Sequence, residues 1–389
     1  KNINHFPPGS FMILDNSNSK NYNLSYKKYT SFPCSNIKYL NRASLYYKII
    51  DNLESAVKKR VSGTTERPIG CLLSGGLDSS LIAALVNKFY KSHEPLQTFS
   101  IGLPGSEDLK YARMVAKHLG TKHNEIILTE DQFFDAIPEV IKTIESYDTT
   151  TIRASVGNYL VGKYIKENTN CKVIFNGDGA DELMGGYLYF KKAPNEYEYD
   201  KECKRLLKDI HMYDVLRSDR CISSHGLEPR TPFLDRKWVE FYLTIDRQLR
   251  FNTTKDKCEK YLIRKSFHEL SYELLPNEIL WRTKEAFSDG VSSLSKSWFE
   301  IISEKINNIT INDSTLRYKL LFLMDMYNKI PITNNKPTTL EQAYYRFIYN
   351  NNYQGTDHLI EYYWMPKYVK ANDASARSLK VYSENNTNK

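Results

Sequence analysis

Several features that mark common enzyme classes are missing from this sequence of 389 residues. Its six cysteines form no C-x-x-C pair, and none lies beside a histidine at the spacing of a metal site. The eight histidines form no H-E-x-x-H motif, which argues against a zinc enzyme. We therefore expect free thiols in a reducing, cytoplasmic compartment.

Long apolar runs are missing as well. No segment approaches the roughly eighteen apolar residues that a membrane-spanning helix needs, and no basic-then-apolar leader is present. Hydrophobic residues make up 41% of the sequence and charged residues 26%, as in ordinary globular proteins. We expect one large core or two smaller ones and no membrane partner. The sequence opens on Lys1, which suggests a piece of a longer protein.

The formal net charge of +8 raises the question of a nucleic-acid partner. The lysines are spread along the sequence and mostly have acidic neighbours, with no dense basic block and no basic strip interleaved with aromatic residues. We interpret the excess as a background compositional bias and expect no nucleic-acid binding.

Short apolar runs alternate with helix-length segments over the first half. The runs that read as strands are 11–15, 69–73, 96–101, 124–128 and 172–175. The helical segments between them are 41–61, 79–90, 108–119 and 150–166. This alternation predicts an α/β fold with a parallel sheet covered by helices on both faces.

Strand signals vanish after about Gly186. Helical periodicity takes over in the segments 206–217, 237–244, 261–270 and 340–350. We therefore expect a largely helical C-terminal half that packs onto the sheet.

The strongest single motif is S-G-G-L-D-S-S at residues 74–80, directly after the strand 69–73 and at the start of the next helix. Glycines let the backbone approach a ligand, and the helix N-terminus attracts an anion such as phosphate. Because Asp78 would repel a phosphate, it implies a bridging Mg²⁺. The motif lacks the lysine of G-x-x-x-x-G-K-[ST] and is not G-x-G-x-x-G. The alternative is a simple helix N-cap turn.

Residues 74–80 resemble the pyrophosphate-binding loop of the ATP pyrophosphatases, which cleave ATP between the α- and β-phosphates. Within that group, five further segments resemble asparagine synthetases of the glutamine-hydrolysing type. They occur along the sequence in the same order as in that family. They read T-F-S-I-G-L-P-G-S at 98–106, E-S-Y-D-T-T-T-I-R-A-S at 145–155, N-G-D-G-A-D-E-L at 176–183, H-G-L-E-P-R-T-P-F-L-D at 225–235 and W-R-T-K-E-A-F-S-D-G at 281–290. Together they are far more specific than the loop alone.

The resemblance implies a five-stranded-type parallel sheet of the adenine nucleotide α-hydrolase-like kind. It also implies three parts: residues 1–35 as the end of a missing N-terminal glutaminase domain plus a linker, 36–370 as the synthetase domain, and 371–389 as a polar tail. Its chemistry would convert aspartate and ATP to β-aspartyl-AMP and pyrophosphate. Ammonia, free or made from glutamine by the missing domain, would then give asparagine and AMP. A homodimer and a monomer both remain open.

The resemblance also assigns roles to residues. ATP and pyrophosphate would be bound by Leu73, Ser74, Gly75, Gly76, Asp78, Ser79, Ser80, Ile101, Gly177 and Asp181. Mg²⁺ would be held by Asp78 and Asp181. Aspartate or its activated form would be bound by Thr150, Thr151 and Arg153, since an arginine fork suits a carboxylate. The catalytic residues would be Asp178, Lys260 and Arg153.

Lys260 would stabilise negative charge on the α-phosphate. Lys255 and Lys257 are competing candidates, and a solvated helix face is the alternative for Lys260 itself.

Asp178 departs from the family, which usually has Glu in this loop with a proton-accepting role toward ammonia. Aspartate pulls the carboxylate back by about 1.5 Å. Since displacements of about 1 Å can cost on the order of 10²-fold in rate, either the backbone compensates or the reaction is slow.

Three rivals remain. Thr150, Thr151 and the segment 281–290 argue against a β-lactam synthetase. A tRNA-modifying enzyme would need a basic RNA-binding patch or a thiol-transfer pair, and neither is present in the sequence. A silent interaction protein would not need Asp78, Asp181 and Arg153, although Asp178 keeps this reading open.

Overall fold

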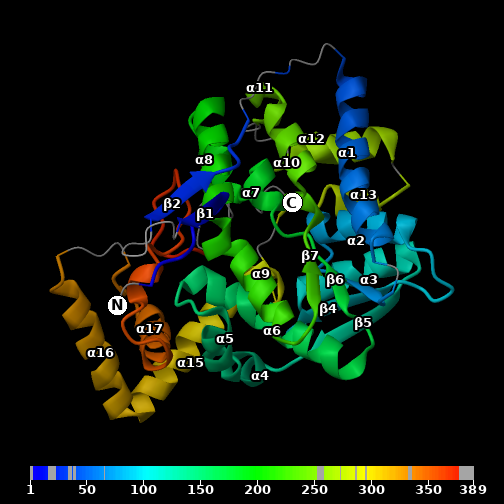
Figure 1. Ribbon diagram of the computed structural model, residues 1–389. Helices are drawn as coiled ribbons and strands as arrows, with labels where there is room; N and C mark the ends of the chain where they lie inside the picture. The colour runs from blue at the N-terminus through cyan, green and yellow to red at the C-terminus, as the bar shows by residue number, and fades with distance from the viewer. Residues whose placement is uncertain are drawn as a thin grey trace.

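The computed structural model describes residues 3–15, 23–33, 37, 41–64, 66–251, 258–271, 273–284, 287–293, 296–331 and 335–375. A five-stranded sheet lies at its centre, and each of its strands pairs in parallel with its neighbours. The strands run in the order β5-β4-β3-β6-β7 (Figure 1). Their bounds are β3 Ile69–Leu72, β4 Gln97–Gly102, β5 Lys122–Ile127, β6 Val173–Phe175 and β7 Glu228–Arg230. The predicted parallel sheet is confirmed.

The order of the strands reverses between β3 and β6. From β3 the chain builds outward to β4 and β5, and it then returns to the other side of β3 with β6 and β7. Such a switch point leaves a crevice outside the carboxyl ends of the two central strands, because their connections leave in opposite directions. The loops that follow β3 and β6 therefore meet at one edge of the sheet.

Helices cover both faces of the sheet (Figure 1). One layer contains α1 Arg42–Ser62, α2 Leu77–Phe89 and α3 Glu107–Leu119. The other contains α4 Glu130–Asp135, α5 Ile137–Ile144, α6 Thr149–Asn168 and α9 Asp214–Ser223. Strand side chains alternate between the layers, because successive residues of a strand point to opposite faces. Val173 and Phe175 belong to the core of the first layer, and Ile174 belongs to that of the second.

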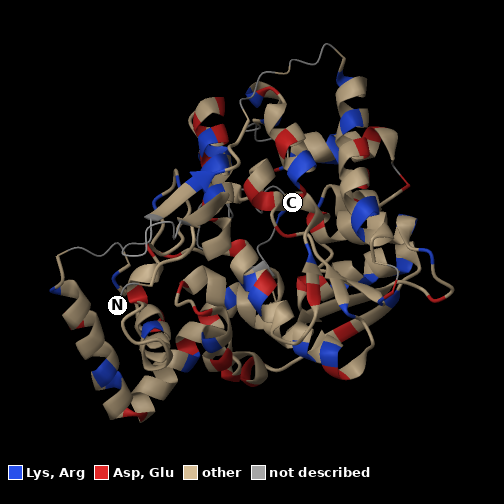
Figure 2. Ribbon diagram, in the orientation of Figure 1, with Lys and Arg blue, Asp and Glu red and all other residues tan. Residues whose placement is uncertain are grey.

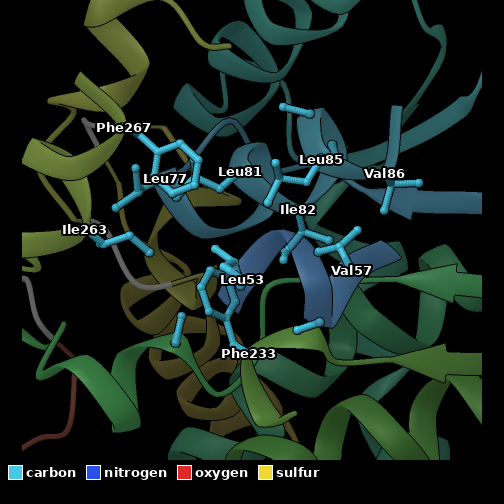
Figure 3. Packing of buried hydrophobic residues seen from close by; sticks show 14 of the residues in the cluster. Leu53, Val57, Leu77, Leu81, Ile82, Leu85, Val86, Phe233, Ile263 and Phe267 are labelled. Carbon is cyan, nitrogen blue, oxygen red and sulfur yellow. The ribbon is translucent and has the colours of Figure 1, made fainter. Parts of the chain in front are cut away.

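The core beneath α1 and α2 consists largely of aliphatic side chains. Figure 3 shows Leu53 and Val57 of α1 close to Ile82 of α2, and all three are fully buried. Burying one such side chain stabilises the fold by about 1.5–3 kcal/mol. Because α2 is held by this packing, the loop between β3 and α2 has a fixed position at the edge of the sheet.

The second half of the chain is largely helical, as expected. Its helices are α7 Ala180–Met184, α8 Glu196–Asp209, α9, α10 Arg236–Thr244, α11 Arg247–Arg250, α12 Tyr261–Leu270, α13 Asn277–Leu280, α14 Phe287–Gly290, α15 Trp298–Asn312, α16 Ser314–Asn328 and α17 Leu340–Asn352.

One expectation for this half is wrong. Strands do not end at Gly186, because β7 adds an edge strand to the sheet. The segment 206–217 is helical as expected, with a 3₁₀ turn at Ile210–Met212 between α8 and α9.

Near the start of the chain, β1 Ser10–Asp15 and β2 Asn23–Lys28 form an antiparallel pair, although residues 23–28 were expected to belong to a linker. Among the described residues, no helix is both long and apolar enough to cross a membrane. Lys and Arg occur beside Asp and Glu on most helices (Figure 2). Within the same residues Cys71, Cys171, Cys203 and Cys221 are buried thiols that form no disulfide.

Candidate active site

A pocket opens at the switch point of the sheet. Its floor and walls come from the carboxyl ends of β3, β4 and β6, the first turns of α2 and α6, helix α9, the start of α12 and the segment 282–284. Twelve of the residues predicted to form the site line this pocket: Leu73, Ser74, Gly76, Asp78, Ser79, Ile101, Thr150, Thr151, Gly177, Asp178, Asp181 and Lys260. The fold therefore brings together side chains that are up to 187 positions apart in the sequence, from Leu73 to Lys260.

The loop between β3 and α2 is held open by glycine and serine. Gly75 has a left-handed φ of +69°, and a Cβ there would lie 2.5 Å from Tyr111 and from the backbone nitrogen of Ala112. The Oγ of Ser79 accepts from the backbone N–H of Ser74 over 3.1 Å and lies 3.0 Å from the Oγ of Ser74. These contacts shape a turn at the N-terminus of α2, where the helix dipole favours an anion.

Gly75 and Ser80 were predicted to contact pyrophosphate, but neither lines the pocket. Gly75 packs against Tyr111 and Ala112 of α3, and the side chain of Ser80 is fully buried. Both residues therefore support the loop rather than present a side chain to a ligand.

Two aspartates and two lysines form a buried network in the pocket. Lys260 Nζ lies 2.5 Å from Asp78 Oδ2 and 2.6 Å from Asp181 Oδ1. Lys284 Nζ lies 2.7 Å from Asp181 Oδ2. Burial by itself would raise the pKa of Asp181, but Lys260 and Lys284 outweigh it and hold this pKa well below its ordinary value. Asp181 is thus ionised across the neutral range.

Asp78 behaves differently from Asp181. Burial raises the pKa of Asp78 above its ordinary value, although Lys260 opposes the shift. Its Oδ1 is buried and has no hydrogen-bond partner within the described part of the chain. An unpaired carboxylate oxygen next to a phosphate-binding turn is a suitable ligand for a divalent cation.

The backbone of Lys260 is also unusual. Its φ of +56° places it in the left-handed region, which costs a residue with a side chain on the order of 1–2 kcal/mol. It is nevertheless 4% exposed and stands directly before α12. Strained residues of this kind concentrate at functional sites.

Two glycines allow the close approach of this network to the backbone. A Cβ on Gly186 would lie 2.0 Å from Asp181 Oδ1 and 2.9 Å from Lys260 Nζ. A Cβ on Gly177 would lie 2.7 Å from the backbone nitrogen of Ser79. Glycine is therefore required where the loop after β6 crosses the start of α2.

A second group of charges surrounds Asp178. Arg217 on α9 places Nη2 3.3 Å from Asp178 Oδ1 and also binds Asp214. Burial raises the pKa of Asp178 above its ordinary value, with Arg217 acting against the shift. Its Oδ2 has no hydrogen-bond partner of good geometry among the described residues, although the nearby hydroxyl of Ser218 acts to lower the pKa of Asp178. Asp178 is thus oriented through one oxygen, and the other is left to accept a proton.

The start of α6 forms another wall. Asp148 caps the helix, with Oδ2 accepting from the N–H of Thr151 over 2.8 Å and from its hydroxyl over 2.7 Å. The buried hydroxyl of Thr150 has no partner in the described structure. This wall therefore offers a hydroxyl to a small polar ligand.

The sequence matches the asparagine synthase family model over residues 48–202 and 191–323. The chain belongs to the asparagine synthase family. It is 48% identical over 332 residues to the asparagine synthetase [glutamine-hydrolyzing] of Gallus gallus, covering 85% of this chain and 56% of that protein. For the proteins of that name from Homo sapiens and Bos taurus, the identities are 45% and 46%. The human match covers 84% of this chain and the bovine match 85%, with 56% of each relative covered. The chain thus spans about half the length of these relatives.

The family implies Mg²⁺, and the residues present fit it. Asp78 and Asp181 stand side by side with one unpaired oxygen on Asp78. No larger group of His, Cys, Asp and Glu with metal-binding geometry occurs in the part of the chain that the structure describes. Mg²⁺ is often bound by only one or two carboxylates together with substrate phosphates, so two are sufficient.

Arg153, like Gly75 and Ser80, is a predicted site residue that does not line the pocket. It is 3% exposed. Its Nε and Nη2 donate to Glu341, and its Nη1 and Nη2 donate to Asp373. Since four of its five N–H groups are occupied in this way, the predicted contact with aspartate has no support in this geometry.

Several pocket residues were missed by the sequence analysis. They are Glu182, Tyr187, Tyr213, Asp214, Arg217, Arg282, Lys284 and Trp364. Arg282 and Lys284 lie in the segment 281–290 that carried the family resemblance, so they could have been found there. Arg282 donates to the carbonyl of Ser74 over 3.3 Å and to Asp108 over 2.8 Å, which fixes the turn before α2. The competing candidates Lys255 and Lys257 lie outside the described residues.

Proposed function

We propose that this pocket binds ATP and aspartate, transfers AMP to the side-chain carboxylate of aspartate, and then converts the adenylate to asparagine with ammonia. Family membership and the names of the relatives support this activity. The single observation that carries it is the meeting of a phosphate-binding turn with Asp78, Asp181, Lys260 and Lys284 in one pocket.

The phosphates of ATP fit against residues 74–79, where backbone N–H groups and the start of α2 favour an anion. Adenine and ribose would lie over Leu73, Ile101 and Gly177, which also line the pocket. Asp78 and Asp181 would hold Mg²⁺, whose charge, when it is bound, neutralises the leaving pyrophosphate. Lys260 and Lys284 place two more cations where negative charge develops.

In the first step, an oxygen of the aspartate side chain attacks the α-phosphorus of ATP. The bond from that phosphorus to the bridging oxygen breaks, so pyrophosphate leaves and a mixed anhydride forms. The step is needed because a carboxylate is a poor electrophile, whereas AMP is a good leaving group. Thr150 and Thr151 are suited to bind the other end of aspartate at this wall of the pocket.

In the second step, ammonia attacks the activated carbonyl carbon. The bond from carbon to the oxygen of AMP breaks, and the products are asparagine and AMP. The attacking nitrogen must lose one proton. Asp178 is suited to accept it, because one of its oxygens is unpaired and burial raises its pKa toward the working range.

The source of ammonia is a separate part of the proposal. The relatives are named glutamine-hydrolysing, and this chain spans about half of their length. We propose that in the full protein a glutaminase domain supplies ammonia to this pocket. A cytoplasmic location, the absence of nucleic-acid and membrane partners, and the oligomeric state remain predictions.

The test is pyrophosphate release and asparagine formation by this chain with ATP, Mg²⁺ and aspartate, using ammonia or glutamine as the nitrogen source. We expect aspartate-dependent pyrophosphate and asparagine with ammonia. Asp78→Asn should abolish both products, whereas Asp219→Asn, an exposed change on α9, should abolish neither. A rate of pyrophosphate release that is the same with and without aspartate would contradict the proposal.

A further inference from the structure

The described end of the chain forms part of the pocket. Trp364 lines the pocket, although it lies 213 positions after Thr151 in the sequence, and it is 8% exposed. Its ring lies 5.3 Å from that of Tyr187, which also lines the pocket. Residues 360–375 contain no helix or strand, so their position depends on contacts with the rest of the protein.

Several hydrogen bonds hold the first part of this segment, including bonds from Asn335 to Ile360 and between Tyr362 and both Arg205 and Asp209. The hydroxyl of Tyr147 donates to the carbonyl of Ile360 over 3.2 Å, and that of Tyr213 donates to the carbonyl of Tyr362 over 2.8 Å. The backbone N–H of Trp364 donates to Asp148 Oδ1 over 2.7 Å. Because the other oxygen of Asp148 binds Thr151, one carboxylate joins Trp364 directly to the wall at the start of α6.

Arg153 fixes the second part of the segment. It binds Asp373 with two N–H groups over 2.7 and 2.8 Å, and Glu341 of α17 with two others over 2.8 and 2.6 Å. Its guanidinium also lies 4.7 Å from the ring of Phe299. Such buried paired charges are geometrically specific, and removing one partner leaves an uncompensated charge in the interior.

Arg153 stands one helical turn after Thr150, on the same helix. Because Arg153 lies on α6 and binds Asp373, it sets the distance between the start of α6 and the segment 360–375. Thr150, Thr151 and Trp364 all line the pocket.

We propose that Arg153 is a positioning residue, which holds residues 360–375 through Asp373 and thereby shapes the aspartate end of the pocket. It acts without touching substrate. The identity of the ligand at this end rests on the proposed function. The two hydrogen bonds from Arg153 to Asp373, which we call the clasp, do not rest on it.

The test compares Asp373→Asn, Asp373→Glu and the control Glu361→Gln, an exposed change in the same segment. Asp373→Asn removes the negative charge to which Arg153 donates two hydrogen bonds. The KM for aspartate should rise roughly tenfold, the size expected for one charge-assisted hydrogen bond, while the KM for ATP and kcat stay near those of the unchanged protein. Asp373→Glu should recover most of this loss, and Glu361→Gln should show none.

Hydrogen–deuterium exchange on the ligand-free chain tests the clasp without any activity. Backbone amides at residues 369–374, which adjoin Asp373, should exchange faster in Asp373→Asn than in Glu361→Gln. Unchanged exchange would overturn the clasp. An unchanged KM for aspartate in Asp373→Asn, together with loss of pyrophosphate formation in Arg153→Lys, would show instead that Arg153 contacts substrate. If the unchanged protein forms no aspartate-dependent pyrophosphate, the proposed function fails while the exchange result still decides the clasp.

Discussion

Lys260 and Asp181 form an ion pair in the pocket, with 2.6 Å between Nζ and Oδ1, and the same ammonium lies 2.5 Å from Asp78. The two carboxylates that would hold Mg²⁺ are thus already bridged by a cation. Side chains of Lys260 and both aspartates are 1–14% exposed, so little water screens this bridge. If Asp78 and Asp181 hold Mg²⁺ as proposed, we expect Lys260 to compete with it when no nucleotide is bound.

This competition predicts that Lys260→Met binds Mn²⁺ more tightly than the unchanged protein when no nucleotide is present. The substitution removes the bridging cation and leaves two neighbouring carboxylates, whose mutual repulsion a divalent ion relieves. Electron paramagnetic resonance of free Mn²⁺ measures the affinity. Lys88→Met, which removes an exposed lysine paired with Glu54, is the control and should not change it. Equal affinities in all three proteins would show that Lys260 does not occupy the metal position.

Asp178→Asn should separate the two chemical steps. Aspartate-dependent pyrophosphate release should continue, because in the proposed mechanism Asp178 accepts a proton only when ammonia attacks. Asparagine formation should fall on the order of 10²-fold, as is common when a general base is removed. Rapid-quench measurement of both products on Asp178→Asn decides this. A parallel loss of pyrophosphate and asparagine would place Asp178 in the first step instead.

Gly177→Ala should damage the nucleotide site through the backbone. The new Cβ would lie 2.7 Å from the nitrogen of Ser79 and 2.8 Å from the carbonyl carbon of Asp78, and neither backbone atom can rotate away. We expect a stability loss of about 1–3 kcal/mol in chemical denaturation and a raised KM for ATP. Gly63→Ala, at an exposed helix end, is the control. A normal KM for ATP in Gly177→Ala would mean that this crossing does not shape the nucleotide site.

Much of the fold could be predicted from the sequence, because strands β3, β4 and β6 are apolar runs with helix-length segments between them. β7 could not, since its residues are Glu228, Pro229 and Arg230. Such a polar strand is tolerated only at an edge, where proline need not donate to a neighbour. Its pairing with β6 depends on the tertiary position of the chain and leaves no periodic signal.

In the site, too, some residues could be predicted from the sequence and the contacts of others could not. Asp78 was predictable from the motif at residues 74–80, and Asp181 from the resemblance of the segment 176–183 to the family. The partners of Arg153 were not, because Glu341 and Asp373 lie about 190 and 220 positions further along the chain. Only the folded chain shows that a motif arginine is already occupied by two carboxylates.

Glu182 should make stability depend on pH. Burial raises its pKa well above the ordinary 4.5, and Asp214 and Asp181 add to the shift. The folded state therefore binds this proton more tightly than the unfolded state does. The associated stability is fully present below about pH 4.5 and is lost as pH rises toward the folded pKa.

Glu182→Gln keeps the shape of the side chain and removes this titration. We therefore expect its Tm relative to that of the unchanged protein to rise between pH 5.5 and pH 8.5. Glu361→Gln, an exposed change, should give a difference in Tm that does not vary with pH. A difference that falls with pH for Glu182→Gln would mean that Glu182 is ionised when folded.

The proposed function requires that AMP is transferred to the side-chain carboxylate of aspartate. Aspartate labelled with ¹⁸O in that carboxylate tests it most directly, with ATP, Mg²⁺ and ammonia, followed by mass spectrometry of the nucleotide. Attack on the α-phosphorus and later cleavage of the carbon–oxygen bond must leave one labelled oxygen in AMP. We predict one ¹⁸O in each AMP formed. Unlabelled AMP, or label found in inorganic phosphate together with ADP, would contradict the account.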